Sequence, residues 1–301
     1  MNKKESGMIF SQKTKGYFFV MIAALFFSCQ TVFGKFLIKM GLSGLDLSFF
    51  QFIIGAAGIF IVCIVTGKIK TVAQESKGRR RWISVMGILS AVTTACIFMS
   101  LETLNAGIAS MLLFTNPVFI CLFFMVTGIK KIGLWNKLAL IIAMAGSMMV
   151  LNVFGASSSG MALVGIVFGI SSSVLYAAYN VYYDIKMGQY SIITTASFTQ
   201  YLAALTIIII HFDIFFDFPH VTWQMIGLAA VTSLLTNLLP IFFLFKGINL
   251  IGSEKAGIVA VAELPFTLLV AFVFLGETLT FIQIAGIVLV ILAVVVLQKE
   301  N

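Results

Sequence analysis

One acidic residue, Glu263, lies deep inside a long apolar stretch of the chain, between residues 256 and 276. A charge in such surroundings costs roughly 2.5–3.5 kcal/mol on membrane-insertion scales and marks a functional site by default. Glu263 could take up and release a proton, or balance the charge of a bound amine. Alternatively, it is a protonated acid that hydrogen-bonds backbone carbonyls freed by Pro265, because proline removes a helical N–H.

Two asparagines precede prolines in other apolar stretches. Asn116 lies directly before Pro117, and Asn237 lies three residues before Pro240. Each side-chain amide could cap carbonyls that the proline leaves unbonded or could hydrogen-bond a substrate, and both interpretations stay open. For threonines in apolar stretches, bonding between helices is the favoured interpretation. The remaining polar candidates are Gln30, Thr31, Thr93 and Thr94.

A polar and aromatic face is expected on a helix that ends near residue 183. Tyr176, Tyr179, Asn180 and Tyr183 recur at i, i+3, i+4 and i+7, so they share one side of a helix. Tyr176 and Tyr179 could stack on an organic substrate or hydrogen-bond it. Tyr182 and Tyr183 are expected at a membrane interface, where tyrosines are enriched.

These side chains belong to a chain that is too apolar to be soluble. Of its 301 residues, 60% are hydrophobic and 10% are charged, with a mean hydropathy of +1.10. Soluble domains have about 45–50% apolar and about 25% charged residues. Too few polar side chains remain to cover a water-facing surface, which excludes a soluble enzyme, a nucleic-acid reader and a disordered chain. We therefore predict an integral membrane protein.

Ten apolar stretches approach the roughly 20 residues that a helix needs to cross a bilayer. One run is long enough for two helices and is expected to break at the turn-forming cluster 155–160. The expected fold class is all-α, with ten transmembrane helices. The runs are 16–34, 47–67, 82–101, 103–129, 138–183 (two helices), 187–210, 221–245, 256–276 and 278–298.

Basic residues gather on one side of these spans. Of the 19 lysines and arginines, all except Lys35 and Lys39 fall in the terminal segments or in loops on the same side as the N-terminus. Because cytoplasmic loops are enriched in lysine and arginine, both termini are predicted to be cytoplasmic, in a multi-pass protein of the cell membrane. Lys35, near the opposite face, is expected to snorkel to the interface as an anchor.

The two halves of the chain, 1–154 and 160–301, resemble each other. Each half contains five predicted spans, an odd number, so the second half enters the membrane from the opposite face. Such inverted repeats are typical of secondary transporters, in which a site at the repeat interface is exposed alternately to each side. The matching residues are Gly16 with Gly165 and Gln51 with Gln200, both 149 apart, and Pro117 with Pro265, 148 apart.

A family resemblance follows from two segments of the second half. Leu275-Gly276-Glu277-Thr278-Leu279-Thr280, with Gln283 and Gly286, resembles the LGE-x-L-T-x-x-Q-x-x-G stretch of the EamA-type family in the drug/metabolite transporter superfamily. Ala262-Glu263-Leu264-Pro265 resembles the family's Glu-Pro segment with one residue inserted. In the first half, Gly128-Ile129-Lys130 replaces the Gly-Glu pair, and Gln51 stands where the family often has arginine. The resemblance implies a ten-helix exporter or permease, in which helices one to four and six to nine surround the path and helices five and ten are scaffold.

Other classes of membrane protein fit the sequence less well. An intramembrane enzyme would need a Ser/His pair, two aspartates or an HExxH zinc site, whereas His211 and His220 lie in a predicted outer loop. No P-loop for ATP-driven transport and no charged ring or filter motif for a channel is present. A lipid or lipid-precursor flippase needs no catalytic residue and is the main alternative.

The sequence thus predicts a secondary carrier of small organic metabolites such as amino acids or amines. No cluster of buried arginine or lysine is available for a phosphate. The four cysteines lie in predicted spans without metal-site spacing, so neither a metal nor a cofactor is expected. The expected partners are the small-molecule substrate and the lipid bilayer, without nucleic acid, for a monomer or homodimer. The predicted substrate site comprises Gln30, Thr94, Asn116, Tyr176, Tyr179 and Asn237, with Glu263 for proton coupling.

Overall fold

The computed structural model describes residues 3–75, 80–104, 106–151, 163–216, 221–275 and 280–299, which form helices and turns. The helices of the first half are α1 (Lys3–Lys39), α2 (Gly44–Val65), α3 (Ile69–Glu75), α4 (Arg80–Thr103), α5 (Ala106–Leu113), α6 (Asn116–Thr127) and α7 (Leu134–Val150). Those of the second half are α8 (Leu163–Tyr182), the π-helix η2 (Tyr183–Met187), α9 (Ile192–Ile210), the 3-10 helix η3 (Phe212–Phe215), α10 (Trp223–Ser233), the π-helix η4 (Leu234–Leu238), α11 (Leu239–Ile251), α12 (Ser253–Ala260), α13 (Glu263–Leu275) and α14 (Phe281–Leu297).

The predicted all-α membrane fold is confirmed. Within the described residues, seven helical segments are long and apolar enough to cross a membrane, and α7 and α14 are shorter apolar helices. A further segment, α12 with α13, completes the ten, since α5–α6 and α10–α11 each count as one. The sequence did not predict α3, which follows α2. The turn predicted at 155–160 and the repeat boundary between 154 and 160 lie outside the described residues.

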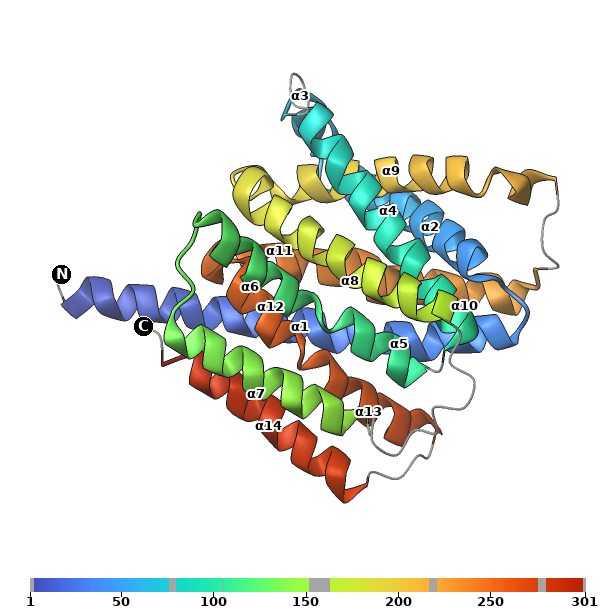
Figure 1. Ribbon diagram of the computed structural model, residues 1–301. Helices are drawn as coiled ribbons and strands as arrows, with labels where there is room; N and C mark the ends of the chain where they lie inside the picture. Colours follow the sequence, from blue (N-terminus) through green and yellow to red (C-terminus); the bar gives the residue numbers. More distant parts are fainter. Residues whose placement is uncertain are drawn as a thin grey trace.

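The two halves run in opposite directions, as expected for an inverted repeat. Helix α1 leads away from the end of the bundle that carries both termini, whereas α8 leads back toward it, and α7 and α14 are opposed in the same way (Figure 1). The packing partners also exchange between the halves: α4 packs against α8, and α11 packs against α1. The second half therefore repeats the contacts of the first with the roles of the halves reversed.

Glycine allows close approach at equivalent places in this packing. A Cβ atom on Gly16 would overlap Ile251 at the end of α11, and one on Gly165 would overlap Thr103 at the end of α4. The matching glycines are therefore contact points between helices. Gly16 brings α1 close to α11, and Gly165 brings α8 close to α4.

Large apolar side chains cover the outside of the bundle, as a lipid environment requires. Helices α7 and α14 pack along each other at one side of it (Figure 1). The most exposed large apolar side chains include Val65, Val126, Leu163, Trp223 and Phe281.

Prolines interrupt three spans and so shape the interior. Pro117 and Pro265 lie in the first turns of α6 and α13, where a missing N–H removes no helical hydrogen bond. The spans consequently break at residues 114–115 and 261–262. Pro240 lies in the first turn of α11 and follows the π-helical turn η4, a local widening that accommodates its missing N–H.

Two expectations for residues at span ends were wrong. Tyr183 is fully buried, with its ring stacked 3.7 Å from that of Phe245, because α11 packs against η2 and covers this face. Lys35 does not snorkel: its Nζ donates to the carbonyls of Leu101 and Leu104, at 2.8 and 3.2 Å. The end of α4 offers carbonyls without helical partners, and α1 lies against that end.

Candidate functional site

A cavity of about 80 Å³ lies between the two repeats. Its walls come from α1, α2, α4, α5 and α6 of the first half and from α8, η4, α11, α12 and α13 of the second, while α7 and α14 contribute none of its lining residues. All seven predicted site residues border it: Gln30, Thr94, Asn116, Tyr176, Tyr179, Asn237 and Glu263. Polar residues that the sequence analysis did not commit to the site also line it: Gln51, Ser90, Thr93 and Thr236.

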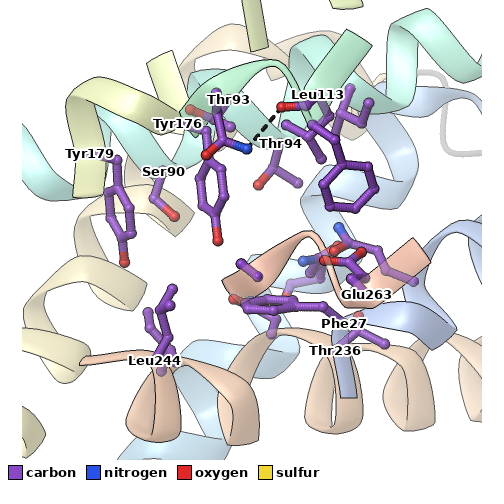
Figure 2. A pocket seen from close by; sticks show the side chains of 18 residues that line it. Phe27, Ser90, Thr93, Thr94, Leu113, Tyr176, Tyr179, Thr236, Leu244 and Glu263 are labelled. Atoms are coloured by element: carbon purple, nitrogen blue, oxygen red, sulfur yellow. Dashed lines mark hydrogen bonds between the residues drawn. The ribbon is translucent and has the colours of Figure 1, made fainter. Parts of the chain in front are cut away.

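In each broken span, the helix that follows the break begins with a polar residue that borders this cavity. Asn116 is the first residue of α6, and Glu263 is the first residue of α13. The Asn116 amide donates to the carbonyl of Leu113 at 2.9 Å and so caps the end of α5 (Figure 2). Interrupted helices at a repeat interface are the usual setting of a transporter's binding site, because the breaks expose polar groups at membrane depth.

Glu263 faces the cavity without a protein partner among the described residues. Its carboxylate makes no hydrogen bond and no ion pair there; the bond at this residue is from Thr267 Oγ1 to the backbone carbonyl, at 2.9 Å. The alternative role, a side chain that satisfies carbonyls freed by Pro265, therefore has no support in the described part of the chain. Among the described residues that line the cavity, none is a lysine or an arginine.

Two stacked tyrosines form one wall. The rings of Tyr176 and Tyr179 lie 6.2 Å apart at an angle of 12°, and their hydroxyl ends point into the space bordered by Phe27 and Leu244 (Figure 2). Tyr179 also contacts the ring of Phe245 at 5.9 Å, which holds it in place from behind.

Three buried polar atoms on the cavity wall lack a hydrogen-bond partner in the described structure: Gln51 Oε1, Thr93 Oγ1 and Tyr179 Oη. An unpaired buried polar group costs about 1–3 kcal/mol, so native proteins pair such groups with protein, water or ligand. Their gathering on one cavity gives a bound polar molecule two hydroxyls and one amide oxygen to bond.

Of the two roles left open for Asn237, capping of its own span is not what the described contacts show. Its side chain exchanges hydrogen bonds with Gln200, at 2.9 and 3.2 Å, and donates to the backbone carbonyl of Gln51 at 3.4 Å. Ser233 donates to the same carbonyl at 2.6 Å. The repeat-related residues Gln51 and Gln200 thus both bond Asn237 in η4, Gln51 through its backbone carbonyl and Gln200 through its side chain.

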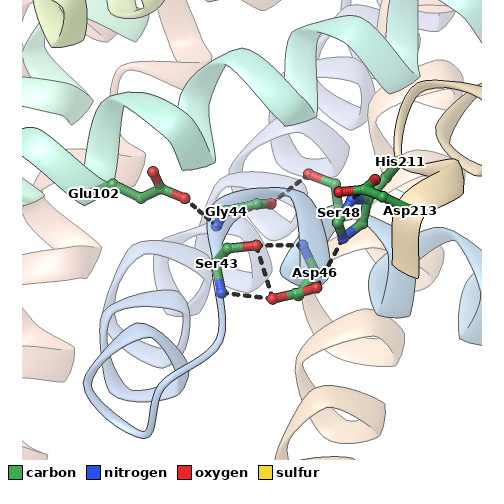
Figure 3. Close-up of polar contacts among 7 residues, drawn as sticks. All are labelled: Ser43, Gly44, Asp46, Ser48, Glu102, His211 and Asp213. Atoms are coloured by element: carbon green, nitrogen blue, oxygen red, sulfur yellow. Dashed lines mark hydrogen bonds and ion pairs between the residues drawn. The ribbon is translucent and has the colours of Figure 1, made fainter. Parts of the chain in front are cut away.

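A second polar cluster, where α2 begins and α9 ends, lies outside this cavity. His211 joins Asp46 at 2.8 Å and Asp213 at 2.9 Å through its two ring nitrogens (Figure 3). Ser48, drawn beside it, donates to the Gly44 carbonyl instead of to His211, so no Ser–His pair is formed. Asp46 also closes the capping box of α2 with Ser43. The cluster ties two helix ends together.

Comparison with known proteins decides the family. The model of the EamA-like transporter family matches residues 14–152 and 163–298, once for each half. The chain belongs to this family. The EamA-like transporter is therefore a membrane protein of a transporter family and not an enzyme, and the resemblance seen in the sequence is confirmed.

Several named relatives of this EamA-like transporter are transporters as well. An uncharacterized transporter of Synechocystis sp. is 25% identical over 71% of this chain and 65% of its own, so the chain spans just under two thirds of that relative. An uncharacterized transporter of Clostridium kluyveri is 22% identical over 95% of this chain and 94% of its own. Solute carrier family 35 member G1 of mouse is 24% identical over 48% of this chain and 39% of its own.

A solved protein structure shares the fold of the EamA-like transporter. It aligns with a TM-score of 0.74 over 94% of this chain and 96% of its own, at 14% identity. Identity at this level shows a common fold and carries nothing about the substrate.

In the described part of the chain, no group of three or more His, Cys, Asp or Glu side chains is arranged to hold a metal ion.

Proposed function

We propose that this EamA-like transporter is a secondary carrier that exchanges protons for small amine-bearing solutes, such as amines or amino acids, across the cell membrane by alternating access. One observation carries the proposal: the carboxylate of Glu263 borders a cavity whose described lining includes no lysine or arginine. A carboxylate at membrane depth requires a counter-charge or a proton. A substrate ammonium group supplies the first, and solvent supplies the second.

The neighbours of Glu263 suit an ammonium-bearing organic molecule. Tyr176 lines the cavity, and an aromatic ring attracts a cation placed over its face by about 0.5–2 kcal/mol. The unpaired atoms Gln51 Oε1, Thr93 Oγ1 and Tyr179 Oη can bond polar substituents of the solute. A phosphate group would instead need basic side chains, which this lining does not offer.

Exchange follows from having one carboxylate for two ligands. Glu263 cannot hold a proton and pair with an ammonium group at once, so binding of either releases the other. A carrier that reorients only when Glu263 is occupied therefore exchanges one proton for one solute, and the two move in opposite directions. Under an inward proton gradient, net flow of the solute is therefore outward.

Reconstituted protein tests this proposal. Proteoliposomes with an imposed pH gradient are assayed with labelled monoamines, diamines, amino acids and a fluorescent phospholipid, beside protein-free liposomes. We expect accumulation of at least one amine class on the acidic side, above the level that passive diffusion gives in the protein-free liposomes. Movement of the phospholipid alone would support a flippase and would contradict the proposal.

A further inference from the structure

Lys35 and Asp184 occupy equivalent positions of the two repeats, 149 residues apart, and they bind equivalent partners. Lys35 Nζ donates to the carbonyl of Leu104 at 3.2 Å and to that of Leu101 at 2.8 Å. Asp184 Oδ2 accepts from the backbone N–H and the hydroxyl of Ser253, at 2.8 and 2.7 Å. Leu104 and Ser253 are likewise 149 residues apart.

Each contact ties the end of a repeat's first helix to the start of the broken span in the same repeat. Lys35, near the end of α1, holds the turn that joins α4 to α5, and α5 leads to the break at Asn116. Asp184, in η2 after α8, holds the first residue of α12, and α12 leads to the break at Glu263. The ends of α1 and α8 lie at opposite ends of the bundle (Figure 1).

The charges of both contacts match the helix ends that they bind. The lysine binds carbonyls at the C-terminal end of α4, and the aspartate binds an N–H at the N-terminal end of α12, which are the favourable combinations with the helix dipoles. The two repeats therefore fasten the same junction by opposite means, the first through carbonyls at the end of one helix and the second through the N–H at the start of the next.

The contact of Asp184 contains more bonds than that of Lys35. Lys130 Nζ, in the segment after α6, lies 2.6 Å from Asp184 Oδ2 and 3.3 Å from Glu254 Oε2. The carboxylates of Asp184 and Glu254 are largely buried, with 13% and 12% of their side chains exposed. Lys35 has no ion pair in the described structure. The bonds of both contacts are charge-assisted, since each has an ionised donor or acceptor. The Asp184 contact has more of these bonds and includes ion pairs, so it is the stronger of the two.

We propose that Lys35 and Asp184 each form a latch, a contact that breaks when its end of the transport path opens, and that the two latches open in turn. The stronger Asp184 latch keeps the path closed, in the resting carrier, at the end of the bundle that carries the start of α1. The inference depends on the alternating access of the proposed function. In an inverted repeat, each half adopts in turn the conformation of the other, so equivalent contacts break in the two opposite openings. Both latches are made in this structure.

The test measures which end of the cavity opens, without any substrate. A single reporter cysteine replaces Ser90, which lines the cavity, in a background in which the four native cysteines are replaced. Right-side-out and inside-out vesicles are labelled with a membrane-impermeant thiol reagent, and an N-terminal tag establishes which face carries the termini. The variants are Asp184→Asn and Lys35→Met, with Lys39→Met as the matched control on α1.

We expect Asp184→Asn to raise the labelling rate from the terminal face roughly tenfold, the shift that loss of one bond to a charged group produces. Lys35→Met should raise it from the opposite face only, and Lys39→Met should change neither. Ser253→Ala, which removes one bond to Asp184 and no charge, should give a smaller rise on the terminal face. Equal rises on both faces, or none in either latch variant, would overturn the proposal.

The result is independent of whether amines are the substrate. Face-specific labelling with no amine transport would leave the latches in place and reject the proposed solute. Amine exchange, with labelling that does not respond to either latch variant, would support the proposed solute and reject the latches.

Discussion

The side chains of Gln200 and Asn237 hydrogen-bond each other twice, at 2.9 and 3.2 Å, between α9 and η4. Both side chains are buried, so their hydrogen bonds join α9 to η4 inside the second repeat, beside the cavity. Removing Asn237 leaves the Gln200 amide unpaired, and removing Gln200 leaves Asn237 with only its longer bond to the Gln51 carbonyl, at 3.4 Å. Each loss costs about 1–3 kcal/mol, whereas removing both together costs less than the sum.

A double-mutant cycle tests the energetic coupling of these two side chains. Asn237→Leu and Gln200→Leu should each lower the melting temperature of the purified protein in detergent, and the double variant should melt no lower than the worse single variant. Strictly additive losses would show that the two amides act independently.

The Tyr179 hydroxyl is expected to serve the solute and not the fold. It is buried at the cavity and has no partner in the described structure, so Tyr179→Phe removes no protein hydrogen bond. We expect an unchanged melting temperature and a KM for uptake that rises about tenfold, the weight of one hydrogen bond to a ligand. Tyr183→Phe, a buried tyrosine outside the cavity lining, is the control. A KM that is equal in both variants would remove Tyr179 from the site.

Asp46 should stabilise the protein far more than its neighbour Asp213. Asp46 accepts bonds from Ser43 and His211 and has 9% of its side chain exposed, whereas Asp213 has 79% exposed. Asp46→Asn should lower the free energy of unfolding by about 1–2 kcal/mol, as lost helix caps do, and Asp213→Asn by less than about 1 kcal/mol. Thermal unfolding of both variants provides the comparison, and a larger loss in Asp213→Asn would contradict the structure.

The Lys130 ion pairs should hold across the physiological pH range. Burial lowers the pKa of Lys130, but the hydrogen bond to Asp184 and the charge of Glu254 raise it by more, so the pKa lies above its usual value. A raised lysine pKa contributes stability that is complete below the unfolded value, about 10.4, and is lost as the pH rises through the folded value.

Lys130→Met should therefore melt below the wild type by the same margin from pH 7 to pH 9. That margin should narrow only above about pH 10.4. Melting curves of both proteins between pH 7 and pH 11 provide the measurement. A margin that already disappears between pH 7 and pH 9 would mean that the pairs do not form as described.

The sequence predicted the spans, the inverted repeat and the residues that border the cavity, because each depends on a local signal. Apolar runs indicate the spans, and an odd number of spans in each half indicates the inversion. A polar residue such as Glu263 or Tyr179 in an apolar span is costly to expose to lipid, so its side chain is expected to face the interior of the bundle. The contacts of Lys35 and Asn237 depend on which helix end or amide lies opposite in space. Spacing from a proline left capping and substrate binding open for both asparagines. Asn116 caps, whereas Asn237 meets Gln200 because η4 turns it toward α9.

The charge of Glu263 is the centre of the account, and its removal is the most direct test. Uptake of a labelled amine into proteoliposomes is measured with and without a pH gradient for the wild type, Glu263→Gln, Glu263→Asp and the exposed-acid control Asp213→Asn. We predict that Glu263→Gln loses both gradient-driven accumulation and amine exchange by more than tenfold, that Glu263→Asp keeps part of each, and that Asp213→Asn matches the wild type. Glutamine retains the size and hydrogen-bonding capacity of the side chain, so a purely structural Glu263 would tolerate it. Accumulation by Glu263→Gln equal to that of the wild type would contradict the account.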